Sequence, residues 1–351
     1  MGRFRGVLLA TDYDDTLYST NATISPENRQ AIEYFVAEGG KFCISTGRSY
    51  INFAIQMEKE RLPVNAPVIL SNGASIYDFA TEKSLWLKHL PPLAPRHLAQ
   101  VCRAFPQVGF EAYHQDEVFT FRANEVTRHH LTRCHLTGVP RAIEAMPVPW
   151  IKVILQHPDP GMLQQVQTYV RTQWPEDYDV TFSNPYLLEV TAKGANKGLS
   201  VLWVANHLQV KRQDIYCVGN GLNDIPMLQV SALSFAPANS YPAVRAAADV
   251  VLPSCDESCV AEMIRQLEAR YPAAPCPLRN AKGWQAHCAC QPFCHGENPA
   301  LMPWGRRPGT ASAPRRSGPG RQCPGAADCR PQSPAPGPGR GPRTGPLGRS
   351  R

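Results

Sequence analysis

Three aspartates stand within four positions directly after a short apolar run near the start of the chain. Asp12, Asp14 and Asp15 follow the segment VLLA at residues 7–10, which has the character of a buried β-strand. Carboxylates gathered at the end of a strand repel one another unless a cation offsets their charge, and oxygen ligands favour Mg²⁺. We therefore predict a magnesium site that uses Asp12 and Asp14, and we interpret Asp15 as a loop residue.

Polar clusters also follow three later apolar runs. The segment STGR at residues 45–48 follows KFCI, and NGLND at residues 220–224 follows IYCVG. Between them, Asn72 and Gly73 follow VILS. Ligands of doubly wound sheets bind at the carboxyl ends of the strands, so we expect these clusters to share one edge. Lys197, near the start of a predicted helix, adds a positive charge that suits a phosphate.

Short apolar strands alternate with amphipathic helices in the first and last parts of the chain. Ser25 and Pro26 can begin a helix that Gly39 closes, and the strand KFCI follows. The same order repeats from residue 196 to residue 271. This alternation is typical of an α/β fold with a doubly wound, Rossmann-like parallel sheet.

The pattern changes between residues 85 and 186, where segments typical of antiparallel strands are mixed with helices. We interpret this part as an α+β cap domain inserted into the α/β core. The core then comprises residues 1–84 and 187–272. Residues 273–351 are rich in Pro, Gly and Arg and could bury little apolar surface, so we expect a disordered tail.

The net charge of +7 belongs to the tail. Residues 276–351 hold 12 Lys/Arg and 2 Asp/Glu, which leaves 24 and 27 for the preceding 275 residues. That nearly neutral part gives no electrostatic reason to expect nucleic acid as a partner. No segment approaches the roughly 20 apolar residues that span a bilayer, and the N-terminal apolar stretch is too short for a secretory signal. We therefore expect a cytoplasmic protein with no membrane partner; its oligomeric state is left open.

Together these motifs resemble those of the haloacid dehalogenase superfamily, and in particular of its Cof-like, type IIB phosphatases. DYDDTL is similar to the first motif of that family, Asp-x-Asp-x-Thr-Leu, and STGRS and LSNGASIYD are similar to its next two segments. GANKGLSV resembles the lysine motif, and VGNGLNDIPML resembles the acidic fourth motif. The resemblance covers about residues 5 to 270, with the inserted domain in the position of the cap.

The resemblance implies a role for each matching residue. Asp12 would be the nucleophile that forms an aspartyl-phosphate, and Asp14 would protonate the leaving oxygen and then activate water. The implied phosphate-binding residues are Thr46, Gly47, Lys197 and Asn223. The implied ligands of Mg²⁺ are Asp12, Asp14 through its main-chain carbonyl, Asn220 and Asp224.

The expected function is that of a Mg²⁺-dependent phosphomonoester hydrolase acting on a small phosphorylated metabolite, with sugar phosphates favoured by the resemblance. The cap would close over the site and select the leaving group. One alternative is a phosphomutase of the same superfamily, which would retain and return the phosphoryl group. Another is a catalytically weakened phosphometabolite-binding protein. The second alternative is motivated by Asn220, because the family usually has an aspartate there and an amide ligates a metal without its charge.

Some of these residues also have a purely structural interpretation. Thr46 could cap the next helix, and Arg48 and Asn72 could brace loops. Two clusters of His and Cys have the composition of metal sites: HHLTRCH at residues 129–135 and HCACQPFCH at residues 287–295. We expect the first cluster to lie on a surface helix of the cap and the second to belong to the tail.

Overall fold

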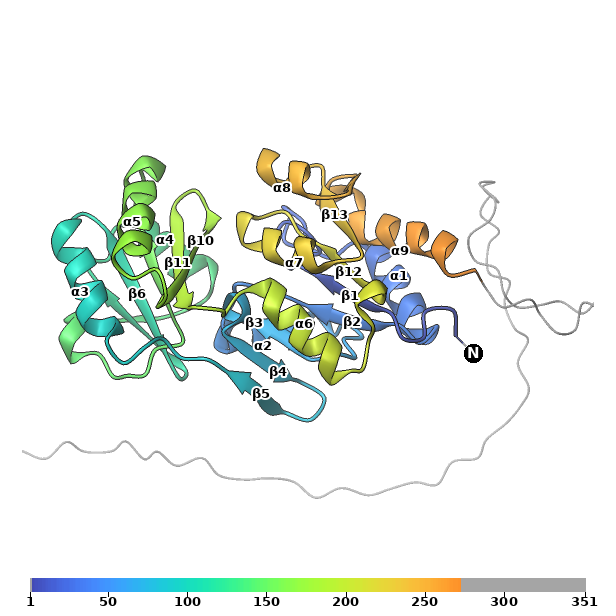
Figure 1. Ribbon diagram of the computed structural model, residues 1–351, viewed down its shortest axis with the longest axis horizontal. Coiled ribbons are helices and arrows are strands. Elements are labelled where there is room, and N and C mark those ends of the chain that lie inside the picture. The colour runs from blue at the N-terminus through green and yellow to red at the C-terminus, as the bar shows by residue number, and fades with distance from the viewer. Residues whose placement is uncertain (1, 273–351) are drawn as a thin grey trace, which may run out of the picture. The chain divides into compact units, whose positions relative to one another are not determined.

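Five parallel strands form the central sheet of the protein, whose computed structural model describes residues 2–272 (Figure 1). The spatial order is β14-β13-β12-β1-β2. The bounds of these strands are β1 (Leu8–Thr11), β2 (Lys41–Ile44), β12 (Ile215–Val218), β13 (Leu233–Pro237) and β14 (Val250–Leu252). Each neighbouring pair is parallel, which confirms the predicted α/β fold class. The predicted tail and the cluster at residues 287–295 lie outside the described residues.

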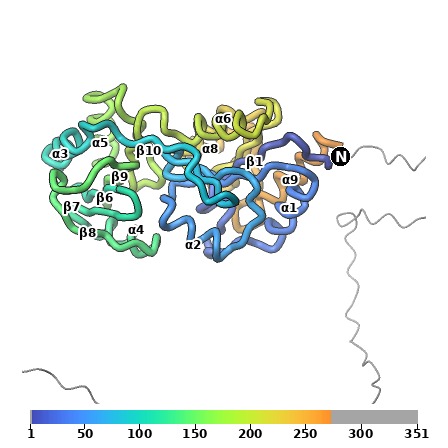
Figure 2. Tube along the Cα trace, turned by 90° about the horizontal axis from the view of Figure 1, so that it is seen from below, coloured from blue at the N-terminus to red at the C-terminus, as the bar shows by residue number. Residues whose placement is uncertain are grey.

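Helices cover both faces of this sheet, because successive residues of a strand point to opposite sides. On one face, Leu9 packs in a cluster with α1 (Pro26–Ala37) and α9 (Cys259–Arg270), which lie side by side in Figures 1 and 2. On the other face, Leu8 packs with α6 (Lys197–His207) and α7 (Ile225–Val230). Burial on both faces explains why the strand sequences are continuously apolar. The remaining helices of this part are α2 (Tyr50–Glu60) and α8 (Pro242–Ala247).

A small antiparallel sheet extends the central one. It contains β3 (Val68–Leu70), β4 (Ser75–Asp78) and β5 (Lys83–Leu87) in that order. A parallel bridge between Ser45 and Ile69 joins it to the end of β2. The strand β5 spans residue 84, where we predicted the end of the first core segment.

The inserted part has its own six-stranded sheet, in the order β10-β11-β9-β6-β7-β8. Its strands are β6 (Gly109–His114), β7 (Glu117–Phe121), β8 (Gly138–Pro140), β9 (Lys152–Gln156), β10 (Tyr178–Asn184) and β11 (Leu187–Ala192). The strand β11, which follows the boundary that we predicted at residue 186, pairs with β9 and β10 in this sheet. We call the elements from α3 to β11 the cap, and the remaining described elements the core.

The two faces of the cap sheet differ in chemistry. Phe110 and Leu155 lie on the face packed with α3 (Ala94–Ala104) and α5 (Pro160–Gln173). Tyr113 and Ile154 lie on the opposite face, which packs with α4 (Glu125–Arg133). By strand alternation the buried Glu111, Lys152 and Glu189 share this second face. The cap therefore presents its buried charges on the side of α4.

Disulfide bonds and membrane-spanning helices are both absent from residues 2–272. The six cysteines of this region are free thiols, and all of them except Cys134 are buried. None of the helices in the same region is long and apolar enough to cross a bilayer.

Candidate active site

Lys197 joins two of the predicted acidic residues at the carboxyl edge of the central sheet. Its Nζ donates one hydrogen bond to Asp12 Oδ1 and another to Asp224 Oδ1, each at 2.6 Å. Asp12 directly follows β1, Lys197 is the first residue of α6, and Asp224 directly precedes α7. Lys197 and Asp224 are fully buried, and Asp12 is 6% exposed. The fold thus brings these three residues together, although Asp12 and Asp224 are more than two hundred positions apart in the sequence.

The cluster places two carboxyl groups around one ammonium group. Burial and the neighbouring Asp224 raise the pKa of Asp12 to about 8, although Lys197 acts in the opposite direction. Burial disfavours the charged form of Lys197, but the two carboxylates outweigh it and raise its pKa. Two carboxyl groups face one ammonium group, so the neutral form of Asp12 is favoured unless a further cation lies beside it and keeps its carboxylate ionised.

Asp14 has a partner that the sequence motifs did not identify. Arg48 donates from Nε to Asp14 Oδ2 at 2.9 Å and from a terminal nitrogen to Asp14 Oδ1 at 2.7 Å. The same guanidinium lies over the ring of Tyr13, 5.3 Å from its centroid. The neighbouring Asp15 has a φ of 56°, and its main-chain carbonyl accepts a hydrogen bond from Asn239. Arg48 thus restricts Asp14, whereas Asp15 has the backbone geometry of a turn.

The residues after β2 and β3 form a buried polar layer beside Asp12. Thr46 Oγ1 accepts a hydrogen bond from the backbone N–H of Arg48 at 3.1 Å within the loop, whereas the N-cap position of the next helix is occupied by Ser49. Asn223 Nδ2 donates to Asn72 Oδ1 at 2.9 Å, whereas Asn72 Nδ2 has no partner among the described residues. Asn72 therefore orients Asn223 and keeps one buried N–H donor unused.

Oxygen donors of the kind that Mg²⁺ prefers are present at this edge. Within residues 2–272, no three His, Cys, Asp or Glu side chains are grouped so that they alone could hold a metal ion. An ion beside Asp12 would therefore also need the amide of Asn220 or a main-chain oxygen. Thr16 Oγ1 donates to Asn220 Oδ1 at 3.1 Å, which orients that amide. Donor type fits Mg²⁺, and an ion beside Asp12 would keep its carboxylate ionised, with one carboxylate fewer than an aspartate at position 220 would supply.

A cavity of about 430 Å³ connects this edge of the core with the charged face of the cap. Asp12, Asp14, Gly47, Asn220 and Asn223 line it from the core. The side chains that line it from the cap include Tyr113, His130, Cys134, Lys152 and Glu189. Thr46, Lys197 and Asp224 are buried and do not line it. Most of the predicted site residues therefore share one cavity, and three of them support it from within the core.

Lys152 connects the two walls of the cavity. Its Nζ donates to the carbonyl oxygen of Gly47 at 2.8 Å and to Glu189 Oε2 at 2.9 Å. A Cβ atom at Gly47 would lie 3.2 Å from both Asn72 Oδ1 and Glu189 Oε1, which is tighter than ordinary contact. Glycine at position 47 therefore lets the loop after β2 approach the cap closely.

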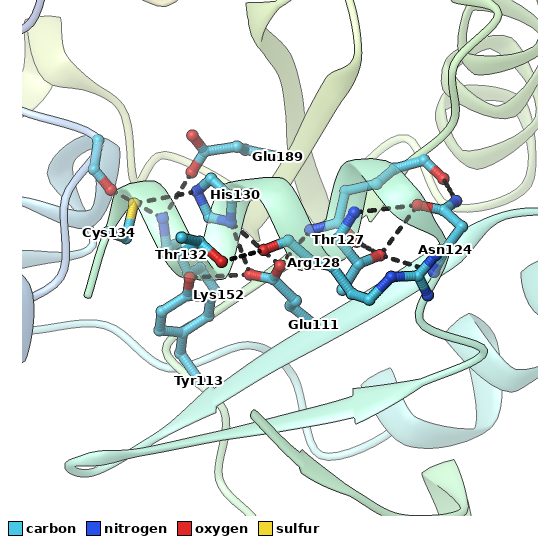
Figure 3. A network of polar contacts seen from close by, with 12 residues as sticks. Glu111, Tyr113, Asn124, Thr127, Arg128, His130, Thr132, Cys134, Lys152 and Glu189 are labelled. Carbon is cyan, nitrogen blue, oxygen red and sulfur yellow. Dashed lines mark hydrogen bonds and ion pairs between the residues drawn. The ribbon is translucent and has the colours of Figure 1, made fainter. Parts of the chain in front are cut away.

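The sequence motifs did not assign the polar residues of the cap to the site, although we expected the cap to select the leaving group. Figure 3 shows Glu111, His130, Cys134, Lys152 and Glu189 as one network of contacts. Strand alternation could have identified part of it, since three of these residues interrupt apolar strand sequences with a charge on one face. The cluster HHLTRCH begins on α4, a cap helix that exposes Glu125, Arg128 and His129, as we expected. His130 lies on the inner side of that helix, where its side chain is 14% exposed and contacts Glu111.

A parallel α/β core with an acidic edge, joined to a cap that lines the same cavity, defines a hydrolase with a separate lid. A family model of the haloacid dehalogenase-like hydrolases matches residues 9–264. The chain belongs to this family. It is a phosphatase, and the resemblance to the Cof-like, type IIB phosphatases that we drew from its motifs is confirmed.

Curated relatives and solved structures agree with this assignment. The 5-amino-6-(5-phospho-D-ribitylamino)uracil phosphatases YcsE and YwtE of Bacillus subtilis (strain 168) are 26% and 23% identical over 258 and 285 residues. Both alignments cover 74% of this chain, and they cover 94% and 97% of the relatives. A structure of a HAD subclass IIB sugar phosphatase is similar with a TM-score of 0.67 and 23% identity, over 74% of this chain and 98% of that one. The structure of a haloacid dehalogenase-like hydrolase from Bacteroides thetaiotaomicron is similar with a TM-score of 0.64 and 22% identity, over 74% of this chain and 99% of that one.

Proposed function

We propose that this phosphatase is a Mg²⁺-dependent phosphomonoester hydrolase that acts on a small phosphorylated metabolite, with a sugar phosphate as the preferred class, in the cytoplasm. The observation that carries the proposal is the placement of Asp12 beside Lys197 at the floor of a cavity that Asp14 also lines. A nucleophilic carboxylate, a neighbouring ammonium and a second carboxylate are the groups that phosphoryl transfer through a covalent intermediate requires.

Asp12 acts as the nucleophile in this proposal. A carboxylate oxygen of Asp12 attacks phosphorus, the P–O bond to the leaving group breaks, and an aspartyl-phosphate forms. Asp14 gives a proton to the leaving oxygen and then takes one from the water that hydrolyses the intermediate. Arg48 keeps the Asp14 carboxylate at the cavity wall through its two hydrogen bonds.

The phosphoryl oxygens are bound by residues of the layer beside Asp12. Lys197 supplies positive charge next to the nucleophile, and Asn223 lines the cavity with an amide that Asn72 orients. The backbone at Thr46 and Gly47 follows β2 at the same edge of the sheet. These groups offset the charge that accumulates on the phosphoryl oxygens as the bond to Asp12 forms.

Mg²⁺ would be held by Asp12, the carbonyl oxygen of Asp14 and Asn220, with Asp224 in support. The ion supplies charge neutralisation between the carboxylates and the incoming phosphate. Asp224 is already bonded to Lys197 and to the N–H of Gly221, so its position is determined by this chain.

The cap selects the leaving group in this proposal. Its cavity wall carries His130, Lys152 and Glu189, which combine hydrogen-bond donors and acceptors. Hydroxyl-rich leaving groups such as sugars can satisfy both kinds of partner. The substrate named for the two Bacillus subtilis relatives also carries a phosphorylated polyol chain.

Phosphate release from p-nitrophenyl phosphate, a panel of sugar phosphates and 5-amino-6-(5-phospho-D-ribitylamino)uracil tests the proposal. We expect release that requires Mg²⁺, stops on addition of EDTA and is lost in Asp12→Asn. Asp116→Asn, which removes an exposed carboxylate of the cap, is the matched control and should retain activity. No release above the Asp12→Asn background would favour a binding protein, and interconversion of sugar phosphates without free phosphate would favour a phosphomutase.

A further inference from the structure

A cysteine, a histidine and a glutamate are aligned on the cap side of the cavity (Figure 3). Cys134 Sγ lies 3.5 Å from His130 Nε2. The other ring nitrogen, His130 Nδ1, lies 3.0 Å from both carboxylate oxygens of Glu111. One end of the imidazole therefore contacts a thiol and the other end contacts a buried carboxylate.

The carboxylate determines which ring nitrogen carries the first proton. Glu111 is fully buried and also accepts hydrogen bonds from Tyr113 OH at 3.0 Å and Gln156 Nε2 at 2.5 Å. Both oxygens of Glu111 already act as acceptors in these contacts, so the hydrogen bond with His130 takes its proton from Nδ1. The Nε2 atom is then directed at the thiol and is free to take its proton.

The electrostatic surroundings favour the pair of a thiolate and an imidazolium. Burial disfavours charge on His130, but its contacts with Cys134 and Glu111 raise its pKa to about 10. Burial alone would raise the pKa of Cys134, but His130 and the more distant Arg48 and Lys152 lower it below the ordinary value. The titratable or charged groups that face the pair are Arg48, Glu111, Tyr113, Lys152 and Glu189.

Cys102 provides a contrast within the same cap. It is 2% exposed in the apolar cluster between the sheet, α3 and α5, and burial raises its pKa to about 12. Cys134 instead lines the 430 Å³ cavity and is half-buried. Asn52 lines the same cavity, is 4% exposed, and its Oδ1 has no partner among the described residues. The lining of the cavity thus includes both an unused buried acceptor and the sulfur of Cys134.

We propose that Cys134 is a thiolate nucleophile that reacts covalently with small carbon electrophiles entering the cavity, with His130 as the acceptor of its proton and Glu111 as the positioning residue. With iodoacetamide, the sulfur lone pair attacks the methylene carbon. The S–C bond forms as the C–I bond breaks, iodide leaves, and the thiol proton stays on His130. The adduct then occupies space in the cavity on the wall opposite Asp12 and Asp14. We expect it to reduce the release of phosphate, and this expectation rests on the proposed function.

The test treats the full-length protein with iodoacetamide and follows each cysteine separately by peptide mass spectrometry as a function of pH. We expect Cys134 to react faster than Cys102 at neutral pH, roughly tenfold for each unit that separates their pKa values. The midpoint of its rate profile should lie below that of a free cysteine thiol. Equal rates at Cys134 and Cys102, or a midpoint at or above the free thiol, would overturn the proposal.

Variants of His130 test whether the reactivity of Cys134 depends on this histidine or only on the exposure of the thiol to solvent. His130→Gln should slow the labelling of Cys134 and move the midpoint of its rate profile to higher pH. His129→Gln removes the exposed neighbouring histidine of the same helix and should leave both quantities unchanged. Glu111→Gln should act in the same direction as His130→Gln, with circular dichroism to verify that each variant is folded. A His130→Gln protein that is folded and labelled at the wild-type rate would contradict the proposal.

Turnover of the labelled protein shows whether the adduct on Cys134 blocks the release of phosphate. Loss of phosphate release in proportion to the modification of Cys134, and no loss when Cys134→Ser is treated in the same way, would support it. Full modification of Cys134 with unchanged turnover would overturn it. If Cys134 is labelled rapidly in a protein that releases no phosphate at all, the proposed function fails while the reactive thiolate stands.

Discussion

Arg48 binds the carboxylate of Asp14 through two hydrogen bonds of 2.9 and 2.7 Å, so that both oxygens of Asp14 are engaged from one side. The arginine comes from the loop after β2 and the aspartate from the loop after β1, two neighbouring strands of the central sheet. Such a two-pronged contact restricts rotation of a carboxylate more than a single ion pair does. Arg48 is therefore a positioning residue for Asp14.

Replacing Arg48 by lysine should reduce turnover while the protein stays folded. A lysine retains the charge but offers no planar pair of donors, so Asp14 gains rotational freedom. We expect kcat for p-nitrophenyl phosphate to fall about 10²-fold, with a smaller change in KM. Arg265→Lys is the matched control, because Arg265 is exposed on α9 and far from Asp14 in the sequence. Wild-type kinetics in Arg48→Lys would show that the contact with Asp14 has no catalytic consequence.

Lys197 should be required for folding stability as well as for activity. Replacing it by methionine leaves Asp12 and Asp224 as neighbouring buried carboxylates with no cation between them. We expect the free energy of unfolding, measured by urea denaturation without added metal, to fall by about 3 to 5 kcal/mol.

A second substitution distinguishes the two roles of Lys197. In Lys197→Met combined with Asp224→Asn, one of the two unpaired charges is removed, so part of the lost stability should return. Phosphate release should stay at background, because no positive side chain adjoins Asp12. Recovery of activity together with stability would mean that Lys197 has only a structural role.

Asn220→Asp should strengthen the binding of magnesium. The new carboxylate keeps the acceptor for Thr16 Oγ1 and adds a negative charge at the acidic edge. We expect the Mg²⁺ concentration for half-maximal activity to fall about tenfold. Asn206→Asp, an exposed position on α6, adds the same charge away from the site and should have no effect. An unchanged Mg²⁺ requirement in Asn220→Asp would contradict our view that the amide weakens the site.

The ion pair between Lys152 and Glu189 should make the stability of the protein depend on pH in the acidic range. Burial alone raises the pKa of Glu189, but Lys152 outweighs it and holds the pKa below the ordinary value of 4.5. A carboxylate with a depressed folded-state pKa contributes stability that is present above 4.5 and is lost as the pH falls further. Glu189→Gln lacks this contribution at every pH.

The measurement compares the free energy of unfolding of wild type and Glu189→Gln near neutral pH and at about pH 4. We expect a deficit of roughly 3 kcal/mol in the variant near neutral pH, because Lys152 loses its buried partner. The deficit should shrink at the lower pH. Glu117→Gln, an exposed substitution in the same cap sheet, is the control. A deficit that is constant or grows on acidification would contradict the assignment of the pair.

The central sheet was predictable because its signals are local. Continuous apolar runs such as VLLA, separated by helices with caps like Ser25, indicate strands that are buried on both faces. Ser25 does accept a hydrogen bond from the N–H of Asn28. The limits of the inserted part are harder to predict, because the strand pairing that assigns β5 and β11 to their sheets is not encoded in either segment alone.

The sequence by itself determined which residues stand at the strand ends and at the start of α6 in the core, since Asp12, Asn220 and Lys197 lie in motifs with a recognisable order. Only the tertiary structure decided how they pair. Lys197 reaches Asp12 across 185 positions, and Lys152 reaches Gly47 across 105. Contacts at such separations depend on how sheets and loops pack, which no local pattern specifies. The activated thiol beside His130 was decided in the same way, by the buried carboxylate that strand alternation directs toward α4.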